Sequence, residues 1–234
     1  GTMKVPVLIE LFRVAERGEL ALDDSLLLVN RFASIVDGSP YALGAGDDSD
    51  SLVYARIGQR VPVRWLAERM IVRSSNLATN ALIALVGGER VTATMRTLGA
   101  ERIMVRRGVE DGPAYAKGLN NTTTARDLAT IMTAIETGRA ASPASCRAMR
   151  DILLRQEWND RIPTGLPPGT RVAHKTGWIT GITHDAALVR RAGRPPFVLV
   201  VLTKGIPDET VAQRLIADIA RLVWAQASAA HHDR

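Results

Sequence analysis

Three short stretches of the sequence combine the hydroxyl, amide and amine side chains that acyl transfer to a nucleophile requires. They are GTMK at residues 1–4, SSN at residues 74–76 and KTG at residues 175–177. Lys4 lies three residues after Gly1 and therefore shares a helical face with it. A lysine one helical turn from a hydroxyl can act as its general base, if a nearby positive charge such as Lys175 lowers the pKa of that lysine. Each stretch alone is commonplace, so their placement in the fold decides their meaning.

Helical spacing of apolar residues and helix-capping residues predict where the first two stretches lie. Helices are predicted over residues 2–17, 61–72, 76–87, 88–99, 124–138 and 142–156, the last two with Thr124 and Ser142 as N-caps. The SSN stretch therefore lies between two helices, where its side chains can leave the helical packing. Polar loops rich in glycine are predicted over 37–51 and 105–121, and a loop as long as the second is often functional.

After residue 170 the pattern becomes strand-like. Strands are predicted over 171–180, 183–192 and 196–205, followed by an amphipathic helix over 209–226. Alternation along the first strand points Lys175 and Gly177 to one face and Thr176 to the other. Helices, an antiparallel meander and one covering helix together predict an α+β fold. We expect one structural domain with a mainly helical lobe at 1–160, which includes the 105–121 loop, and an α+β lobe at 161–234.

Composition and charge limit the classes of function. The 234 residues are 46% hydrophobic, and no apolar run approaches the roughly 20 residues that span a bilayer, so no membrane span is predicted. The net charge is +6, but the basic residues are scattered without interleaved aromatic residues, which predicts no nucleic-acid partner. The single cysteine, Cys146, excludes an internal disulfide and is interpreted as an ordinary helix residue.

Taken in order, the three stretches resemble the S-x-x-K, S-D-N and K-T-G motifs of the serine penicillin-recognising enzymes. The flanking segments MIVRSSNLATNALIALVGG, GLNNTTTARDLATIM and HKTGWITGITHDAALV are similar to those of class A β-lactamases and their close serine-hydrolase relatives. The resemblance covers nearly the whole chain. It implies a β-lactamase/transpeptidase-like fold, an antiparallel sheet covered by helices. It also implies an N-terminal helix and two strands ahead of residue 1 that complete a five-stranded sheet.

The resemblance also implies roles for individual residues. Residue 1 would be the nucleophile position, with Lys4 as its base and Ser74 as the proton shuttle to the leaving nitrogen. Asn76 would hydrogen-bond the amide side chain of the substrate. Lys175 and Thr176, with Gly177 next to them in the KTG strand, would bind the substrate carboxylate. The backbone N–H groups of residue 1 and Trp178 would form the oxyanion hole. His184 lies where some relatives carry a carboxylate-binding arginine, although it could equally pair with Asp185.

The sequence departs from the family pattern at two functional positions. Gly1 has no hydroxyl, so no acyl-enzyme can form there in this chain. A deliberate replacement, a truncated chain and a natural pseudoenzyme are the three explanations, and competent residues at the other motif positions favour one of the first two. In the 105–121 loop, Glu110 is the candidate deacylating base and Asp111 an alternative, but Ala114 stands where class A enzymes carry asparagine. A simple exposed carboxylate is the competing interpretation of Glu110.

The leading functional hypothesis is a class A β-lactamase-like serine hydrolase that opens β-lactams through an acyl-enzyme. A D,D-peptidase, penicillin-binding protein or esterase of the same fold is one alternative, and a non-catalytic binding protein is another. The resemblance implies a small-molecule substrate, either a β-lactam or a peptidoglycan-like peptide, and no metal or cofactor. It also implies export to the periplasm or the medium.

Overall fold

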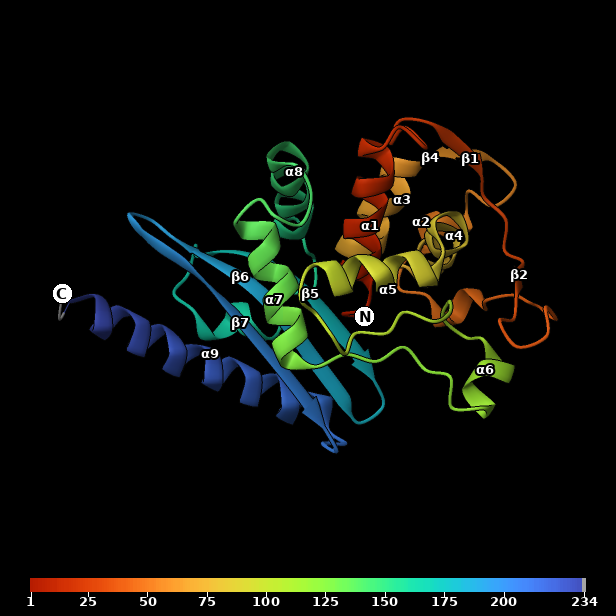
Figure 1. The fold of residues 1–234 in the computed structure, drawn as a ribbon. Helices are drawn as coiled ribbons and strands as arrows, with labels where there is room; N and C mark the ends of the chain where they lie inside the picture. The colour runs from red at the N-terminus through yellow and green to blue at the C-terminus, as the bar shows by residue number, and fades with distance from the viewer. Residues whose placement is uncertain (233–234) are drawn as a thin grey trace.

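The computed structural model of the chain describes residues 1–232 and has a three-stranded antiparallel sheet with helices on both faces (Figure 1). Helix α9 covers one face of the sheet, and α7 and α8 cover the other. The remaining helices pack beyond α8 and β5, with α1 at their centre. The predicted α+β class is therefore confirmed.

The described helices and strands follow one another along the chain in this order. They are α1 (Lys4–Glu16), β1 (Ser25–Leu27), β2 (Phe32–Ala33), β3 (Pro40–Tyr41), the 3-10 helix η1 (Ala45–Asp47), α2 (Ser51–Tyr54), β4 (Arg60–Pro62), α3 (Val63–Val72), α4 (Asn76–Val86), α5 (Gly88–Thr97), α6 (Gly112–Ala116), α7 (Ala125–Glu136), α8 (Pro143–Leu154), the 3-10 helix η2 (Ile162–Gly165), β5 (Arg171–Ile179), β6 (Ile182–Arg191), β7 (Arg194–Lys204) and α9 (Glu209–His232). All seven predicted helices and all three predicted strands are present.

The helix ends follow the predicted capping chemistry. Thr124 accepts a hydrogen bond from the backbone N–H of Asp127, and Ser142 accepts one from Ser145, as N-cap hydroxyls do. The last helix is longer than its predicted end at residue 226, because α9 continues to His232.

Several short elements carry no readable period and were not predicted. The four strands β1 to β4 have two or three residues each, too few for alternation to register. The 105–121 loop is not irregular throughout, since Asp111 caps the five-residue helix α6. A bridge between Met104 and Thr122 joins the two ends of this loop. The loop is therefore a closed, anchored segment.

The sheet has the order β5-β6-β7 with antiparallel pairing throughout, as predicted. Lys175 lies opposite Ala186, and Gly177 lies opposite His184. One side of the β5–β6 pair contributes Ala173, Ala186 and Leu188 to the main core, and the other side contributes to a second core beneath α9. The sheet is therefore buried between two separate apolar layers.

Helix α1 forms the axis of the main core. Its residues Val5, Leu8, Ile9 and Leu11 are completely buried, and the helix contacts α3, α4, α5 and α8. A helix that is apolar on nearly every side belongs in the interior. This burial fixes the first turn of α1, and with it Lys4, against the start of α4 and the strand β5.

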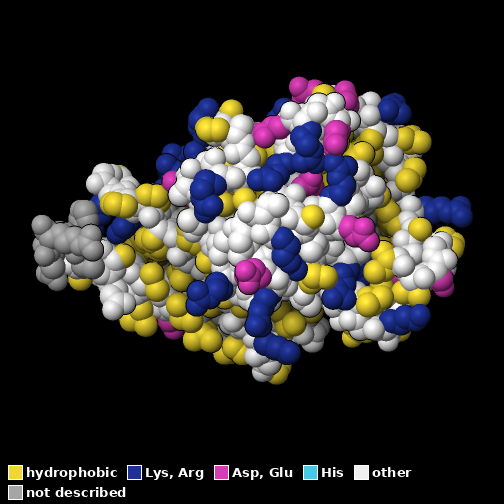
Figure 2. All heavy atoms as spheres, viewed as in Figure 1, with side chains coloured by type: hydrophobic (Ala, Val, Ile, Leu, Met, Phe, Trp, Pro, Cys, Tyr) yellow, Lys and Arg dark blue, Asp and Glu magenta, His cyan; other side chains and the backbone are white. Residues whose placement is uncertain are grey.

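The surface seen in Figure 2 shows lysine and arginine side chains distributed singly over the molecule, whereas hydrophobic side chains gather over α9 and β7. Three large apolar residues of α9 are exposed to solvent: Val211, Leu215 and Leu222. Among residues 1–232, no helix is both long enough and apolar enough to cross a bilayer.

The 3-10 helix η2 approaches α9 so closely that only glycine fits at their contact. A Cβ on Gly165 would come within 2.0 Å of the carbonyl oxygen of Ala217. Because the obstructing atom is backbone, the clash cannot be relieved by a rotamer change. Gly165 therefore sets how closely α9 can pack beneath the sheet.

We expect Gly165→Ala to lower the free energy of unfolding by about 1–3 kcal/mol, the usual cost of overpacking a closed contact. Urea unfolding followed by circular dichroism measures this loss. Gly112→Ala is the matched control, since a Cβ at Gly112 meets nothing within 4 Å. Equal stability of the two variants would show that α9 is not fixed by this contact.

Candidate active site

A pocket of about 660 Å³ brings the three sequence motifs together. Of the residues predicted for the site, its wall contains Gly1, Lys4, Ser74, Asn76, Glu110, Thr176, Gly177 and Trp178. Lys175 and His184 are not part of this wall. Segments more than 170 residues apart in the chain thus meet at one cavity, and Figure 1 shows the N-terminus beside β5.

The centre of the site is a hydrogen-bonded group of four side chains. Lys4 Nζ donates to Ser74 Oγ at 2.9 Å, to the Ser74 carbonyl at 2.8 Å and to Asn76 Oδ1 at 2.9 Å. Lys175 Nζ donates to the same Ser74 Oγ at 3.1 Å. Two ammonium groups therefore converge on one hydroxyl, which gives a proton a path between Lys4, Ser74 and Lys175.

Ser74 reaches this position through an uncommon backbone conformation. It lies between the end of α3 and the start of α4, with φ at +62°. A left-handed serine costs roughly 1–3 kcal/mol, which the surrounding contacts must offset. Ser75 follows as the N-cap of α4, accepting a hydrogen bond from Ala78. The turn directs the Ser74 hydroxyl toward the lysines while α4 begins at Asn76.

Burial sets the protonation of both lysines. Lys4 is 2% exposed, and burial lowers its pKa to about 7, against an opposing attraction from Asp48. Burial also lowers the pKa of Lys175 well below its usual value, with the charge of Lys4 as the next cause. From the sequence, the positive charge of Lys175 was expected to lower the pKa of Lys4. In the structure, burial of Lys4 is the main cause of its low pKa.

Strand β5 forms one wall of the pocket. Thr176 and Gly177 face the cavity at its edge, and Trp178 is half exposed beside them. Lys175 is fully buried and donates to the Thr176 carbonyl at 2.7 Å as well as to Ser74. Thr176 is therefore the direct candidate for contact with a substrate carboxylate, while Lys175 acts from behind the wall.

The nucleophile position lies against this strand. A Cβ on Gly1 would come within 2.4 Å of the Thr176 carbonyl oxygen and 2.5 Å of Gly177 Cα. A side chain at residue 1 therefore requires a local shift of its backbone or of β5. The backbone of residue 1 is still close enough to β5 for the proposed oxyanion hole to be built from both.

The two candidate carboxylates of the 105–121 loop differ in their surroundings. Glu110 is exposed, has φ at +68° and lines the pocket. Asp111 is 1% exposed and accepts hydrogen bonds from the Ser34 hydroxyl and the Ile35 and Ala114 amides. Asp111 anchors the loop, caps α6 and does not line the pocket, so the geometry favours Glu110 as the candidate base.

The suggested pairing of His184 with Asp185 is wrong. Asp185 pairs instead with His174, whose Nδ1 lies 2.8 Å from Asp185 Oδ1. His184 is half buried, its Nδ1 lies 3.0 Å from the Thr183 carbonyl oxygen and 3.2 Å from the Thr203 amide nitrogen, and burial lowers its pKa. His184 does not line the pocket, and its lowered pKa makes it less suited than an arginine to receive a carboxylate.

Arg161 is a pocket residue that the sequence argument missed. It is 3% exposed, lines the pocket and forms ion pairs with Asp160 and, at 3.4 Å, with Glu209. Its Nε–H is buried and has no hydrogen-bond partner among residues 1–232. No motif or period marks this arginine, which enters the site only because η2 docks against α9 and β6.

A fully buried polar group supports Lys175 from behind. His174 bonds Asp185 through Nδ1 and Asn159 Oδ1 through Nε2, both at 2.8 Å. The second oxygen of Asp185 accepts a hydrogen bond from the Ile162 amide. The negative charge of Asp185 also opposes the lowering of the Lys175 pKa. The pair therefore connects the KTG strand to the segment that carries Arg161.

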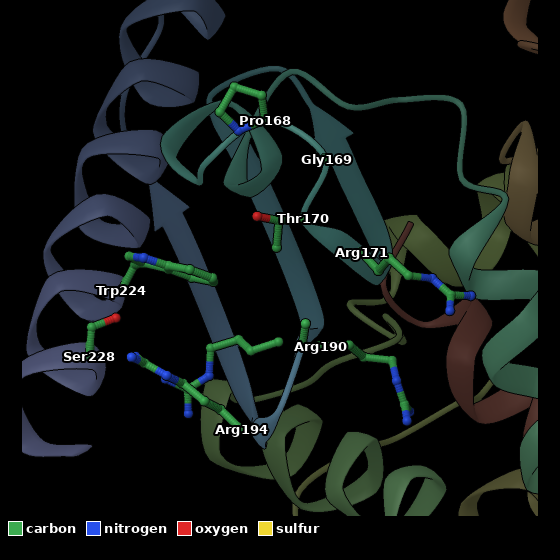
Figure 3. A pocket seen from close by; sticks show the side chains of 10 residues that line it. Pro168, Gly169, Thr170, Arg171, Arg190, Arg194, Trp224 and Ser228 are labelled. Carbon is green, nitrogen blue, oxygen red and sulfur yellow. The ribbon is translucent and has the colours of Figure 1, made fainter. Parts of the chain in front are cut away.

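A larger cavity, of about 770 Å³, lies between α9 and the β6–β7 turn (Figure 3). Trp224 and Ser228 of α9 face Thr170 across it, while the side chains of Arg171 and Arg190 extend away from Trp224. None of the motif residues lines this cavity. Among the described residues, no group of three or more histidine, cysteine or acidic side chains is arranged to hold a metal ion.

Comparison with known proteins defines the class. The family model described as the β-lactamase enzyme family matches residues 1–227. The chain is 32% identical over 173 residues to β-lactamase AST-1 of Nocardia asteroides, covering 72% of this chain and 56% of that protein. It is 34% identical over 157 residues to β-lactamase Toho-2 of Escherichia coli, covering 64% and 53%. The chain therefore belongs to the β-lactamase enzyme family.

Solved structures agree with this assignment. A β-lactamase from Sphaerobacter thermophilus has 31% sequence identity and a TM-score of 0.80, covering 94% of this chain and 79% of that one. The structure of PBP-A has 28% identity and a TM-score of 0.80, covering 97% and 80%. The β-lactamase/transpeptidase-like fold is thus confirmed. The chain spans only 53–61% of the length of six of the curated relatives that it matches.

We expect His174→Leu to destabilise the protein by about 3–5 kcal/mol, because it leaves the Asp185 carboxylate buried without the imidazole that it is hydrogen-bonded to. Equilibrium unfolding in urea measures the loss. The double variant His174→Leu/Asp185→Asn is the control, since it removes the unpaired charge and keeps an acceptor for the Ile162 amide. A double variant no more stable than the single one would exclude the buried charge as the cause.

Proposed function

We propose that the pocket is the acyl-transfer site of a β-lactam-recognising serine hydrolase, in which Gly1 occupies the nucleophile position. The observation that carries the proposal is the convergence of Lys4 and Lys175 on the Ser74 hydroxyl, within 3.1 Å, beside Asn76 and the KTG strand. With Gly1, the protein binds its substrate without forming an acyl-enzyme. With serine at this position, the same surroundings supply a base, a proton shuttle and an oxyanion hole.

The reaction with a serine would run as a two-step proton transfer. The serine oxygen bonds to the substrate carbonyl carbon while its proton passes to neutral Lys4. The backbone N–H groups of residue 1 and Trp178 would hold the oxyanion. As the carbon–nitrogen bond breaks, Ser74 gives its proton to the leaving nitrogen and regains one from Lys4 through their 2.9 Å hydrogen bond. Lys4 is then neutral again for the next step.

The substrate carboxylate would lie between Thr176 and Arg161. Thr176 and Arg161 are both on the pocket wall, and the guanidinium of Arg161 keeps its positive charge, whereas burial lowers the pKa of His184. Lys175 would support this end electrostatically from behind β5. A hydrogen bond from a charged donor is stronger than a neutral one, which favours Arg161 over His184 for this role.

Hydrolysis of the acyl-enzyme distinguishes a β-lactamase from a penicillin-binding protein. Glu110 faces the pocket and would activate the deacylating water, but Ala114 is buried in α6 and offers no amide to position it. Deacylation without this partner should be slow, which favours the penicillin-binding alternative. PBP-A, with 28% identity, has been solved as a mutant in an acyl-enzyme complex with penicillin G. Export, as the family resemblance implies, remains part of the proposal.

The first test compares the Gly1 chain with the Gly1→Ser variant after mixing each with benzylpenicillin. Intact mass spectrometry should show a penicilloyl adduct only on the serine variant, because glycine has no group to acylate. Because of the close contact with Thr176 and Gly177, we expect acylation slower than in an enzyme evolved with serine. Persistence of the adduct for hours indicates a penicillin-binding protein, and rapid loss with drug consumption indicates a β-lactamase.

Two results would contradict the proposal. One is an adduct of equal yield on both chains, which would place the nucleophile elsewhere. The other is the absence of both binding and acylation in a folded Gly1→Ser chain. A Lys4→Gln substitution in the Gly1→Ser chain serves as the control for base catalysis, with an expected loss of about 10²–10⁴ in acylation rate.

The acylation rate of the Gly1→Ser chain should depend on pH through Lys4. The pKa of this lysine is lowered to about 7, so the neutral form that accepts the proton increases as pH rises through 7. Stopped-flow acylation from about pH 5 to 9 should therefore show a rate that rises about tenfold per pH unit below the midpoint and then levels off. A pH-independent rate would remove Lys4 from the base role.

A further inference from the structure

The active-site pocket has the opposite charge to the protein as a whole. The chain has a net charge of +6, yet five carboxylates and three cationic side chains contribute to the site. The carboxylates are Asp47, Asp48, Glu110, Asp160 and Glu209. The cations are Lys4 and Arg161 on the wall and Lys175 behind it. The site is therefore negative even if both lysines are protonated, and more so when burial removes their protons.

Three of these carboxylates gather at the Asn76 end of the pocket. The Asp48 side chain accepts hydrogen bonds from the Ser75 hydroxyl at 3.2 Å and the Leu77 amide at 2.8 Å, on either side of Asn76. The Asn80 side chain, one turn further along α4, bonds the backbone of Val109 and so holds Glu110 beside the same helix. The 44–49 loop and the 105–121 loop thus meet above Asn76.

The proximity of these charges is visible in a neighbouring tyrosine. Burial raises the pKa of Tyr54 to about 12, and Asp48, Asp47 and Glu110 all add to the rise. The Tyr54 hydroxyl donates to the Gly44 carbonyl at the base of the 44–49 loop. The Tyr54 hydroxyl is therefore close enough to all three carboxylates for each of them to raise its pKa.

The negative charge at this end is largely uncompensated. At the opposite end, Asp160 and Glu209 both pair with Arg161, and Lys175 adds a second amino group behind Thr176. Asp47 and Glu110, by contrast, are exposed and form no ion pair with any residue of the described chain. These carboxylates would repel an anionic substrate unless the substrate also carried a positive charge.

We propose that the pocket selects zwitterionic substrates, with the substrate carboxylate at the Thr176–Arg161 end and a positively charged group on its acyl side held by Asp47 and Glu110. This inference rests on the proposed function, because Asn76 orients the acyl amide and so places the acyl side chain under the two loops. Arg161, which lines the same pocket, supplies a permanent positive charge at the opposite end. A peptide or β-lactam with an ammonium next to its acyl carbonyl fits both ends.

Benzylpenicillin and ampicillin test this proposal, because ampicillin adds one α-ammonium group to an otherwise identical acyl side chain. The Gly1 chain is suited to the measurement, since its complexes are non-covalent. Isothermal titration at about pH 6 and low ionic strength should give ampicillin an affinity about fivefold higher, the size expected of a solvent-exposed charge pair. Raising the salt to about 1 M should reduce the ratio toward one.

Asp47→Asn should lower this ampicillin preference at least twofold and leave benzylpenicillin binding unchanged or slightly stronger. Asp37→Asn is the matched control, because Asp37 is an exposed carboxylate of the same 37–51 segment that does not line the pocket. Equal affinities for the two penicillins, or a ratio unaffected by Asp47→Asn, would overturn the proposal and leave the proposed function intact. Failure of both penicillins to bind would overturn the proposed function, and this inference with it.

Discussion

The structure depends on the burial of two amino groups against one hydroxyl. Lys4 and Lys175 are each almost inaccessible to solvent, yet both reach Ser74 Oγ. Burying an ammonium group is costly unless the group is paired with an anion or loses a proton. Burial lowers the pKa of both lysines, which favours the neutral amine. A neutral amine beside a hydroxyl is the chemical condition for base catalysis. The same desolvation that weakens the fold locally therefore creates the reactive group.

The neighbouring elements serve to hold this arrangement in place. Helix α1 is buried on nearly every side, so Lys4 cannot turn toward solvent without disturbing the core. Ser74 adopts a left-handed conformation that α3 and α4 enforce from either side. Behind β5, the His174–Asp185 pair places a negative charge near Lys175 that offsets part of the desolvation. Packing, backbone strain and buried charge thus act on the same few atoms.

Local sequence predicts most of the scaffold but only part of the site. The helices around Lys4 and Ser74, and the strand with Lys175, follow from periodicity and caps because each signal lies within one element. The contribution of Arg161 could not be predicted, since it depends on η2 docking between α9 and β6. The buried role of Asp111 was equally hidden, because its partners Ser34 and Ile35 are 77 and 76 residues away along the chain. Tertiary contacts decide which polar residues are structural and which are free to react.

Binding and chemistry are separable in this pocket because different residues are responsible for them. Gly1 removes the nucleophile, but the wall that contacts substrate is formed by β5, the start of α4 and the two acidic loops. Long-range electrostatics depends on the carboxylates and Arg161, which a change at residue 1 leaves in place. Under the proposed function, a chain with glycine there would keep the charge pattern of the pocket and lack the nucleophile. Selectivity would then be set by these charges before any bond is made, and a serine would act only on ligands that the charges admit.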